Sequence, residues 1–217
     1  MPNEFTKQRK IKTHMKKHIL LTLGLAAFVC ASQAQEKLAE SIKATRAEAT
    51  GTYQQLDTSL NALNALVQQK SGDLRPAYNN FQSEVPKTEI AAATTKSRAE
   101  AMTKDSGTYF ADWQKTIDGI ENKSLQKKAQ KRMKAAMKSY TKVTEELRDA
   151  AEKFRPFLSD LNDVKKTLVN DVTADGVKSV KSTVRSANWN YKAVAGAIND
   201  ALDEMKKMEK ALSASAS

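Results

Sequence analysis

Side chains that commonly carry out chemistry are scarce in this 217-residue chain, and the most reactive of them lie near its start. The chain has two histidines, His14 and His18, and one cysteine, Cys30, so residues 35–217 contain neither type. Thiol nucleophiles, histidine-based triads and zinc sites of cysteine and histidine all require these residues. We therefore expect no catalytic site, metal site or cofactor beyond residue 34, and we expect that the protein is not an enzyme.

Acidic residues are the remaining candidates for chemistry, and their spacing is unfavourable. Adjacent acids occur at 145–146 and 203–204. Neighbours on a helix point about 100° apart, so neither pair forms a compact dyad. The segment 171–176 resembles the start of a calcium loop, but Ser182 stands where that loop needs a glutamate. We interpret the acid pairs as solvated charge and the segment as a turn between helices.

Residues 15–34 have the features of a secretory signal peptide. Two lysines precede an apolar stretch at 19–29, and small residues occupy the positions that a signal peptidase reads. The arrangement predicts cleavage between Ala34 and Gln35 and export to the periplasm. Translation then starts either at Met15 or at the first methionine, the second with a longer basic leader. Cleavage removes six basic residues and one acidic residue, which lowers the formal net charge from +11 to +6.

Two other fates of this leader remain open. An uncleaved leader would anchor the protein, but the apolar stretch is too short to span a bilayer comfortably. A lipoprotein signal would attach lipid to Cys30, but such signals place a small residue before the cysteine, and here Val29 precedes it. The sequence therefore favours cleavage over either alternative.

Beyond the leader, apolar residues recur at alternating spacings of three and four. The pattern is most regular in one stretch, at Ala129, Met133, Ala136, Tyr140, Val143, Leu147, Ala150, Phe154, Phe157, Leu161, Val164 and Leu168. Such spacing over five or more heptads indicates a long helix with coiled-coil-type packing. Glycine and proline together number only 11, too few for the turns of a many-stranded β-sandwich.

Short breaks at 71–73, 119–124 and 170–176 separate four segments of this kind. We expect helices at roughly 36–70, 74–119, 124–169 and 175–212. Short connections between long helices imply antiparallel neighbours. The prediction is therefore an all-α fold, with residues 35–217 as one domain built as an elongated antiparallel up-down bundle of four long helices. The middle of the second helix has mainly small residues on its seam and should pack either weakly or closely.

A run of cations at the start of the third helix is the strongest charge feature. Its members, here called the basic face, are Lys123, Lys127, Lys128, Lys131, Arg132, Lys134 and Lys138. Most fall on the outward side of the helix, near its N-terminus, where the helix dipole disfavours cations. The basic face is therefore either a solubilising surface or a binding surface for an anionic partner, such as lipid headgroups, lipopolysaccharide or an acidic protein. Nucleic acid is a poor candidate, because no aromatic residues alternate with these charges and export separates the protein from it.

Trp189 occupies an unusual position in the fourth helix. With Val184, Ala187 and Tyr191 on the seam, Trp189 falls opposite the core. Two interpretations remain open: Trp189 is an exposed contact residue, or the bundle rotates near Gly196 and brings it into a second seam.

Several short motifs together resemble a known family. They are Ser71-Gly72-Asp73-Leu74, Tyr78, Phe110-Ala111-Asp112-Trp113, Asn122-Lys123-Ser124-Leu125, Tyr140, Pro156-Phe157-Leu158, Asp163 and Leu168. The combination resembles an exported bacterial family of helical proteins catalogued as domain of unknown function 2959. The chain departs from that family at 165–172, where the family tends to carry histidine and asparagine. The resemblance implies an exported helical protein of a Gram-negative-type bacterium and supplies no activity or site residues.

Two functions are carried forward from the sequence. The first is a non-enzymatic periplasmic bundle with a structural, scaffolding or protein-interaction role, through an unknown protein partner or self-association. The alternative is a cell-envelope protein that binds anionic lipid or glycolipid through the basic face. A membrane-active bundle is disfavoured, because no second apolar stretch is long enough to insert.

Overall fold

The computed structural model describes the backbone of residues 4–214 and the side chains of residues 33–213. These residues form five helices: α1 (Glu4–Gln68), α2 (Arg75–Asp118), α3 (Lys123–Leu168), α4 (Ala174–Ser179) and α5 (Lys181–Ala214). No strand occurs among them, so the all-α prediction is confirmed. The expected fourth helix is divided at Val180, which separates the short α4 from α5. Apart from Gln33 and Ala34, the side chains of the expected leader, including that of Cys30, lie outside the described residues.

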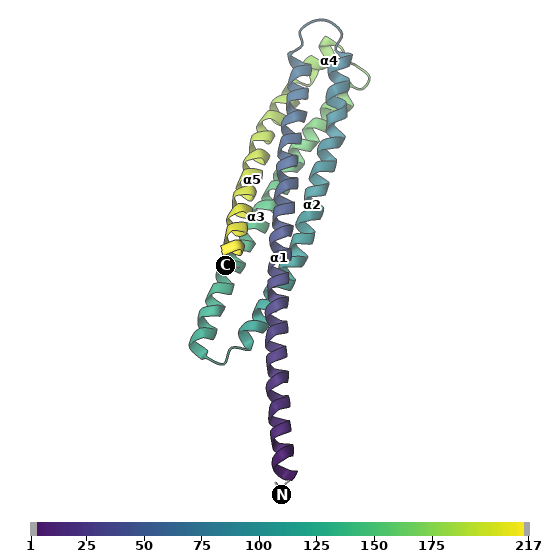
Figure 1. Ribbon diagram of the computed structural model, residues 1–217. Coiled ribbons are helices and arrows are strands. Elements are labelled where there is room, and N and C mark those ends of the chain that lie inside the picture. The colour runs from purple at the N-terminus through teal and green to yellow at the C-terminus, as the bar shows by residue number, and fades with distance from the viewer. Residues whose placement is uncertain (1–3, 215–217) are drawn as a thin grey trace.

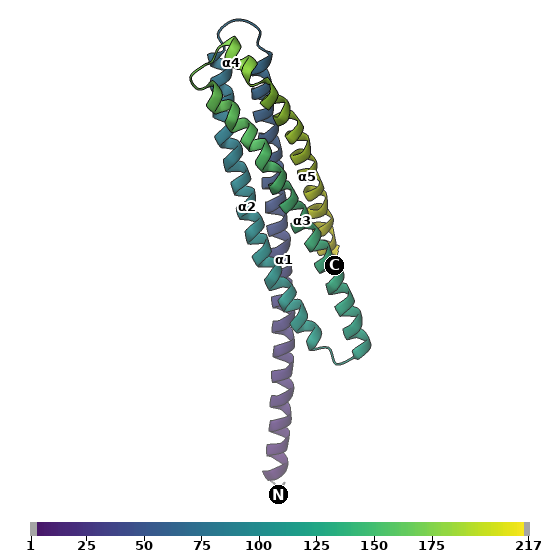
Figure 2. The same cartoon turned by 180° about the vertical axis from the view of Figure 1, so that it is seen from behind.

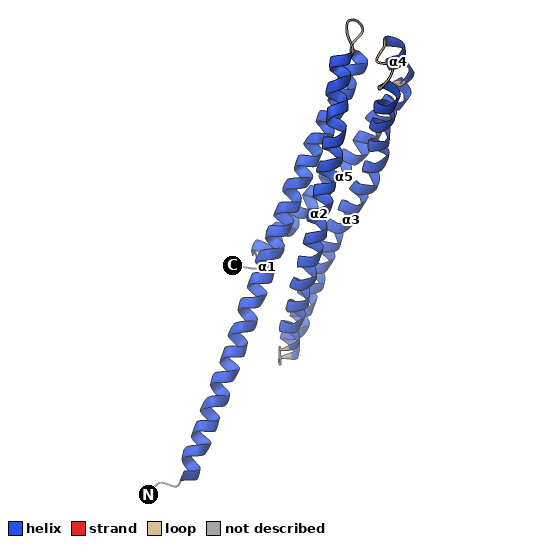
Figure 3. Cartoon of the chain, turned by 90° about the vertical axis from the view of Figure 1, so that its right-hand side faces the viewer, coloured by secondary structure: helices blue, strands red, loops and turns tan. Residues whose placement is uncertain are grey.

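The long helices run antiparallel to their neighbours in an elongated bundle (Figure 1). α1 packs along α2 and along α5, and α3 completes the ring by packing on α5 and α2. Seen from behind, α5 ends well before the loop that joins α2 to α3 (Figure 2). The α2–α3 hairpin therefore projects beyond the end of α5, and the N-terminal part of α1 extends still further in the same direction (Figure 3). Among the residues searched, no helix is long and apolar enough to cross a membrane.

Local residues account for the ends of the helices. Gly72, in the turn after α1, has φ +87°, a conformation that favours glycine. The Asn122 side chain caps α3 by accepting hydrogen bonds from the backbone N–H groups of Ser124 (3.0 Å) and Leu125 (3.1 Å). The turn before α4 needs Gly176, since a Cβ there would meet the carbonyl oxygen of Asp171 at 2.2 Å. α3, in contrast, continues through Pro156.

Two apolar clusters form the core. One lies near the α1–α2 turn and contains the fully buried Phe157 and Leu161. The other lies toward the α2–α3 hairpin and contains Leu38 and Met205. Leu147, which the heptad spacing places on the most regular seam, is only half-buried. Small side chains, among them Ala49 and Ala92, stand across from it.

The α1–α2 interface is close and partly polar. Thr45, Thr52 and Ser59, seven residues apart on α1, are all buried. Thr52 and Thr95 share a hydrogen bond of 2.9 Å between their hydroxyl oxygens, and the Ser59 hydroxyl bonds to that of Thr88. Small hydroxyl-bearing residues thus allow the backbones of α1 and α2 to approach each other. Of the two alternatives expected for the middle of α2, weak packing or close packing, the structure has the close one.

Two buried carboxylates of α2 take part in the same interface. Gln55 of α1 donates a hydrogen bond to Glu84 at 2.9 Å. Asp105 accepts from Ser41 and pairs with Lys37, whose Nζ lies 3.0 Å away. Burial alone would raise the pKa of the Asp105 carboxyl, but the bonds from Ser41 and Lys37 and the nearby positive charges hold that pKa below its usual value. Asp105 is therefore a charged, satisfied structural group that ties α1 to α2.

Candidate binding surface on the projecting hairpin

The basic face covers the outer side of α3 on the projecting hairpin. All seven of its side chains are exposed. On the opposite side of the helix, Met133 and Tyr140 are buried. This division follows from the 3.6-residue period, which turns the cations away from the seam that packs on α2. The structure therefore brings all seven predicted residues together on one surface.

None of the seven cations forms a salt bridge with another described residue. The ion pairs of the described part of the chain lie elsewhere, as in Lys115–Asp112 on α2 and Lys153–Asp149 further along α3. Lys123 Nζ donates to Gln126 Oε1 at 3.3 Å, a contact with a neutral group. The cations of the basic face are thus not held in ion pairs with described residues, which leaves them available to an external anion.

An aromatic cluster beneath the basic face joins α2 to α3. Phe110 stacks on Trp113 with ring centroids 6.5 Å apart, and it meets Tyr140 of α3 edge-on at 6.1 Å. Tyr109 packs on both aromatic residues of α2. Burial raises the pKa of the Tyr109 hydroxyl, although the nearby charge of Arg132 partly opposes this. Tyr109 and Tyr140 also belong to the apolar cluster that contains Met208 and Leu212 of α5, so the aromatic residues join the hairpin to the core of the bundle.

Two glutamine contacts also hold the hairpin together. Gln130 Nε2 donates to Gln114 Oε1 at 3.1 Å, and Gln126 Nε2 donates to the Ile117 carbonyl oxygen at 3.2 Å. With the Asn122 cap, these bonds fix the start of α3 against the end of α2. The cations are therefore presented on an ordered support.

Apolar side chains flank the basic face, a feature that the sequence reasoning missed. Leu125 is 55% exposed and Met137 is 42% exposed. Both lie within the run of cations, and neither falls on the three-four spacing of the seam. Their position off the seam was the signal that could have found them. Because 12 residues separate them, the two side chains lie about 120° apart around α3, on opposite edges of the basic face.

A comparison with family models gives one match, to the family described as protein of unknown function DUF2959, over residues 29–212. The chain belongs to the DUF2959 family. The match covers the whole basic face and extends nearly to the end of α5. No curated protein and no solved structure matches the chain.

In this DUF2959 protein, the residues that carry the family resemblance are mainly structural. Asn122 is a helix cap, and Phe157 and Leu168 are fully buried. Tyr78 is also buried, and its hydroxyl donates to the Lys165 carbonyl oxygen at 2.9 Å. These residues define caps and core, so the resemblance identifies a fold and no chemical site.

Trp189 lies on α5, away from the basic face, and 74% of it is exposed. The side chains on either side of it contact two different helices. Asn188 exchanges hydrogen bonds with Asn64 of α1, and Asn190 donates to Asp160 of α3 at 2.7 Å. Contacts with both adjacent helices hold this stretch of α5, with Trp189 facing outward between them. The interpretation of Trp189 as a residue of a second seam is therefore wrong.

The acidic groups considered for chemistry have ordinary surroundings in this DUF2959 protein. Glu204 binds Lys207 at 2.7 Å, and this bond lowers the pKa of its carboxyl group. Asp171 accepts a hydrogen bond from the Thr173 hydroxyl at 2.6 Å, within the turn that precedes α4. Among the described residues, no three histidine, cysteine or acidic side chains lie close enough together to hold a metal ion.

Proposed function

We propose that the protein is an exported, non-enzymatic scaffold of the cell envelope that binds an anionic lipid or glycolipid surface through the basic face. One observation carries the proposal: seven exposed cations share a surface of the projecting hairpin, and none pairs with a described acid. The sequence alone placed a scaffolding or protein-interaction role first. The gathering of seven exposed cations without ion pairs supports the anionic surface more strongly.

The shape of the bundle supports this role. The first part of α3 lies beyond the end of α5 (Figure 1), so α5 does not stand between this part of the bundle and a flat surface. Headgroups would neutralise the cations on the outer side of α3. Electrostatic attraction of this kind acts over about 10 Å at moderate ionic strength and weakens as salt is added.

Vesicle co-sedimentation tests the proposed function. The protein should bind vesicles that contain anionic phospholipid or lipopolysaccharide, and should not bind vesicles of neutral phosphatidylcholine. Binding should fall steeply as the salt concentration rises from about 0.05 to 0.5 M, because screening shortens the reach of the charges. Equal binding to neutral and anionic vesicles would contradict an electrostatic mechanism.

Export is part of the same proposal and has its own test. Leu38, which lies four residues beyond the expected cleavage site, is fully buried in the cluster near the hairpin. Cleavage after Ala34 would keep Leu38 on the exported chain. We expect the intact mass of protein from a periplasmic fraction to correspond to a chain that begins at Gln35. A mass that includes diacylglycerol on Cys30 would instead place the protein on a membrane through a lipid anchor.

A contact role for Trp189 is the second candidate, because this large aromatic side chain gains little from folding. Trp189→Ala should change the free energy of unfolding by less than about 0.5 kcal/mol, as expected for an exposed residue. It should weaken self-association, which sedimentation equilibrium measures. A loss of about 3–5 kcal/mol in stability with unchanged association would show that the side chain acts in the fold and not in a contact.

A further inference from the structure

Residues with three-four spacing, here called the outer stripe, follow the outer side of α5. All of them are exposed: Ser182, Arg185, Trp189, Lys192, Gly196, Asp200, Asp203 and Lys207. They lie opposite the buried seam of α5, which packs on α1 and α3. Trp189, whose side chain is large and apolar, is 74% exposed within this stripe. The outer stripe therefore has the spacing of a helix–helix contact, and it faces away from the helices of its own bundle.

Charge is divided along the outer stripe. Arg185 and Lys192 lie in its first half, and no acidic residue occurs from position 176 to position 199. Asp200 and Asp203 lie in its second half. None of these four side chains forms a salt bridge with another described residue. The stripe thus offers unpaired positive charge before Gly196 and unpaired negative charge after it.

Such a charge pattern is complementary to itself when a second copy of α5 runs antiparallel to the first. In a two-fold contact with its axis at Gly196, positions equally far from that residue face each other. Lys192 of each copy then faces Asp200 of the other, which gives two ion pairs of opposite charge. Trp189 faces Asp203, so its indole N–H can donate to that carboxylate while its ring packs on the second helix.

The centre and the ends of the outer stripe are compatible with this contact. Gly196 has no side chain, and a Cβ there would meet nothing within 4 Å, so a second helix can approach its backbone closely. Toward the ends, Arg185 faces Lys207, whose charge is compensated by Glu204 at 2.7 Å. One helix from each copy buries less than the roughly 1,600 Å² of a standard interface, so the dimer should be weak and dependent on concentration.

We propose that the protein forms a symmetric dimer through antiparallel contact of two α5 helices. The axis lies at Gly196, and Lys192 of each copy pairs with Asp200 of the other. This inference rests on the contact role proposed for Trp189 and identifies the partner as a second copy of the chain. It is separate from the binding of an anionic surface by the basic face, which lies on α3.

Charge reversal tests the arrangement, with sedimentation equilibrium of the full chain as the readout. Lys192→Asp places two aspartates opposite each other, and Asp200→Lys places two lysines opposite each other. Each variant alone should raise the Kd of the dimer at least about tenfold. An equimolar mixture of the two variants should associate again, because the heterodimer restores both pairs of opposite charge. Positions 192 and 200 lie roughly 12 Å apart along one helix, so a contact within one chain cannot explain this recovery.

A glycine substitution tests the centre of the contact. Gly196→Leu places a bulky side chain on the axis and should raise the Kd of the dimer at least about tenfold, because the two helices can no longer approach. Gly107→Leu is the matched control. A Cβ at Gly107 also meets nothing within 4 Å, but this residue lies on α2, outside the proposed contact, so association should be unchanged. Both sites are exposed, and circular dichroism should show wild-type helicity in both variants.

The outcomes separate this inference from the proposed function. The α5 dimer is overturned if the wild-type chain stays monomeric at every concentration, if the mixed charge variants do not associate, or if folded Gly196→Leu dimerises as the wild type does. Should Trp189→Ala weaken association while the mixture fails to recover it, the contact role of Trp189 stands and the antiparallel arrangement is wrong. Vesicle binding is measured separately, so its failure would contradict the role of the basic face and leave the α5 dimer standing.

Discussion

Replacement of Leu161 by aspartate is expected to unfold the bundle. Leu161 is fully buried in the cluster near the α1–α2 turn, together with Phe157 and Val164 of the same helix. The substitution removes a large apolar side chain, which costs about 2–5 kcal/mol, and also places a carboxylate without a partner in the core. The combined loss should be at least about 5 kcal/mol, comparable to the whole stability of a typical domain.

Leu125→Asp is the matched control for this experiment. It makes the same chemical change in the same helix, but Leu125 is exposed and lies in the first turn of α3, where an acid interacts favourably with the helix dipole. Its stability should change by less than about 0.5 kcal/mol. Thermal unfolding followed by circular dichroism at 222 nm measures both variants. A folded Leu161→Asp variant with a melting temperature near that of the wild type would contradict the core as described.

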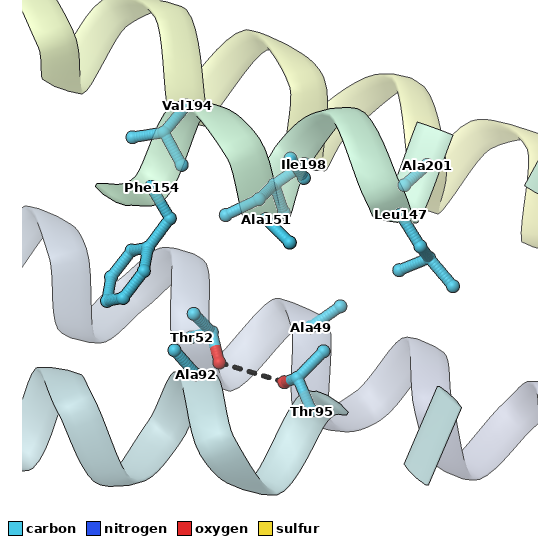
Figure 4. Close-up of a pocket in the computed structure, with 11 residues that line it drawn as sticks. Ala49, Thr52, Ala92, Thr95, Leu147, Ala151, Phe154, Val194, Ile198 and Ala201 are labelled. Atoms are coloured by element: carbon cyan, nitrogen blue, oxygen red, sulfur yellow. Dashed lines mark hydrogen bonds between the residues drawn. The ribbon is translucent and has the colours of Figure 1, made fainter. Parts of the chain in front are cut away.

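Leu161 and Leu147 show what heptad spacing can and cannot predict. Both lie on the same regular seam of α3, and spacing alone assigns them equal roles. Leu161 is fully buried, whereas Leu147 is half-buried and borders a cavity of about 70 Å³ in the middle of the bundle (Figure 4). The difference depends on the sizes of side chains across the bundle, such as Ala49 and Ala92, and their position opposite Leu147 follows only from the folded arrangement. The cavity had no sequence signal for this reason.

Other features were open to sequence reasoning in different degrees. The outward orientation of the Trp189 side chain was predictable from its heptad position, because helix period alone decides which face a residue occupies. The separation of α4 from α5 at Val180 was not predictable, since the three-four spacing of apolar residues continues through it. The outward direction of the basic face was also predictable. Its lack of ion pairs was not, because pairing depends on which acids the neighbouring helices bring near Lys127 or Lys131.

Removal of three cations from the basic face is expected to abolish most binding to anionic vesicles. The variant carries Lys127→Ala, Lys131→Ala and Lys134→Ala, all at exposed positions of α3 without a recorded ion pair. Each lysine close to an anionic membrane contributes about 1 kcal/mol to binding. The loss of three should therefore weaken the affinity roughly 100-fold. Stability should be nearly unchanged, because none of the three side chains supports the core.

A second triple variant separates a local effect from a change in overall charge. Lys178→Ala, Lys181→Ala and Lys192→Ala remove the same total charge from exposed positions on α4 and α5, away from the projecting hairpin. If the basic face binds the surface, this control should bind vesicles nearly as well as the wild type, because its substitutions lie outside the contact. Equal loss of binding in the two triple variants would mean that net charge alone attracts the protein. That result would remove the reason to assign a binding role to the hairpin, whereas loss in the first variant alone assigns the contact to α3.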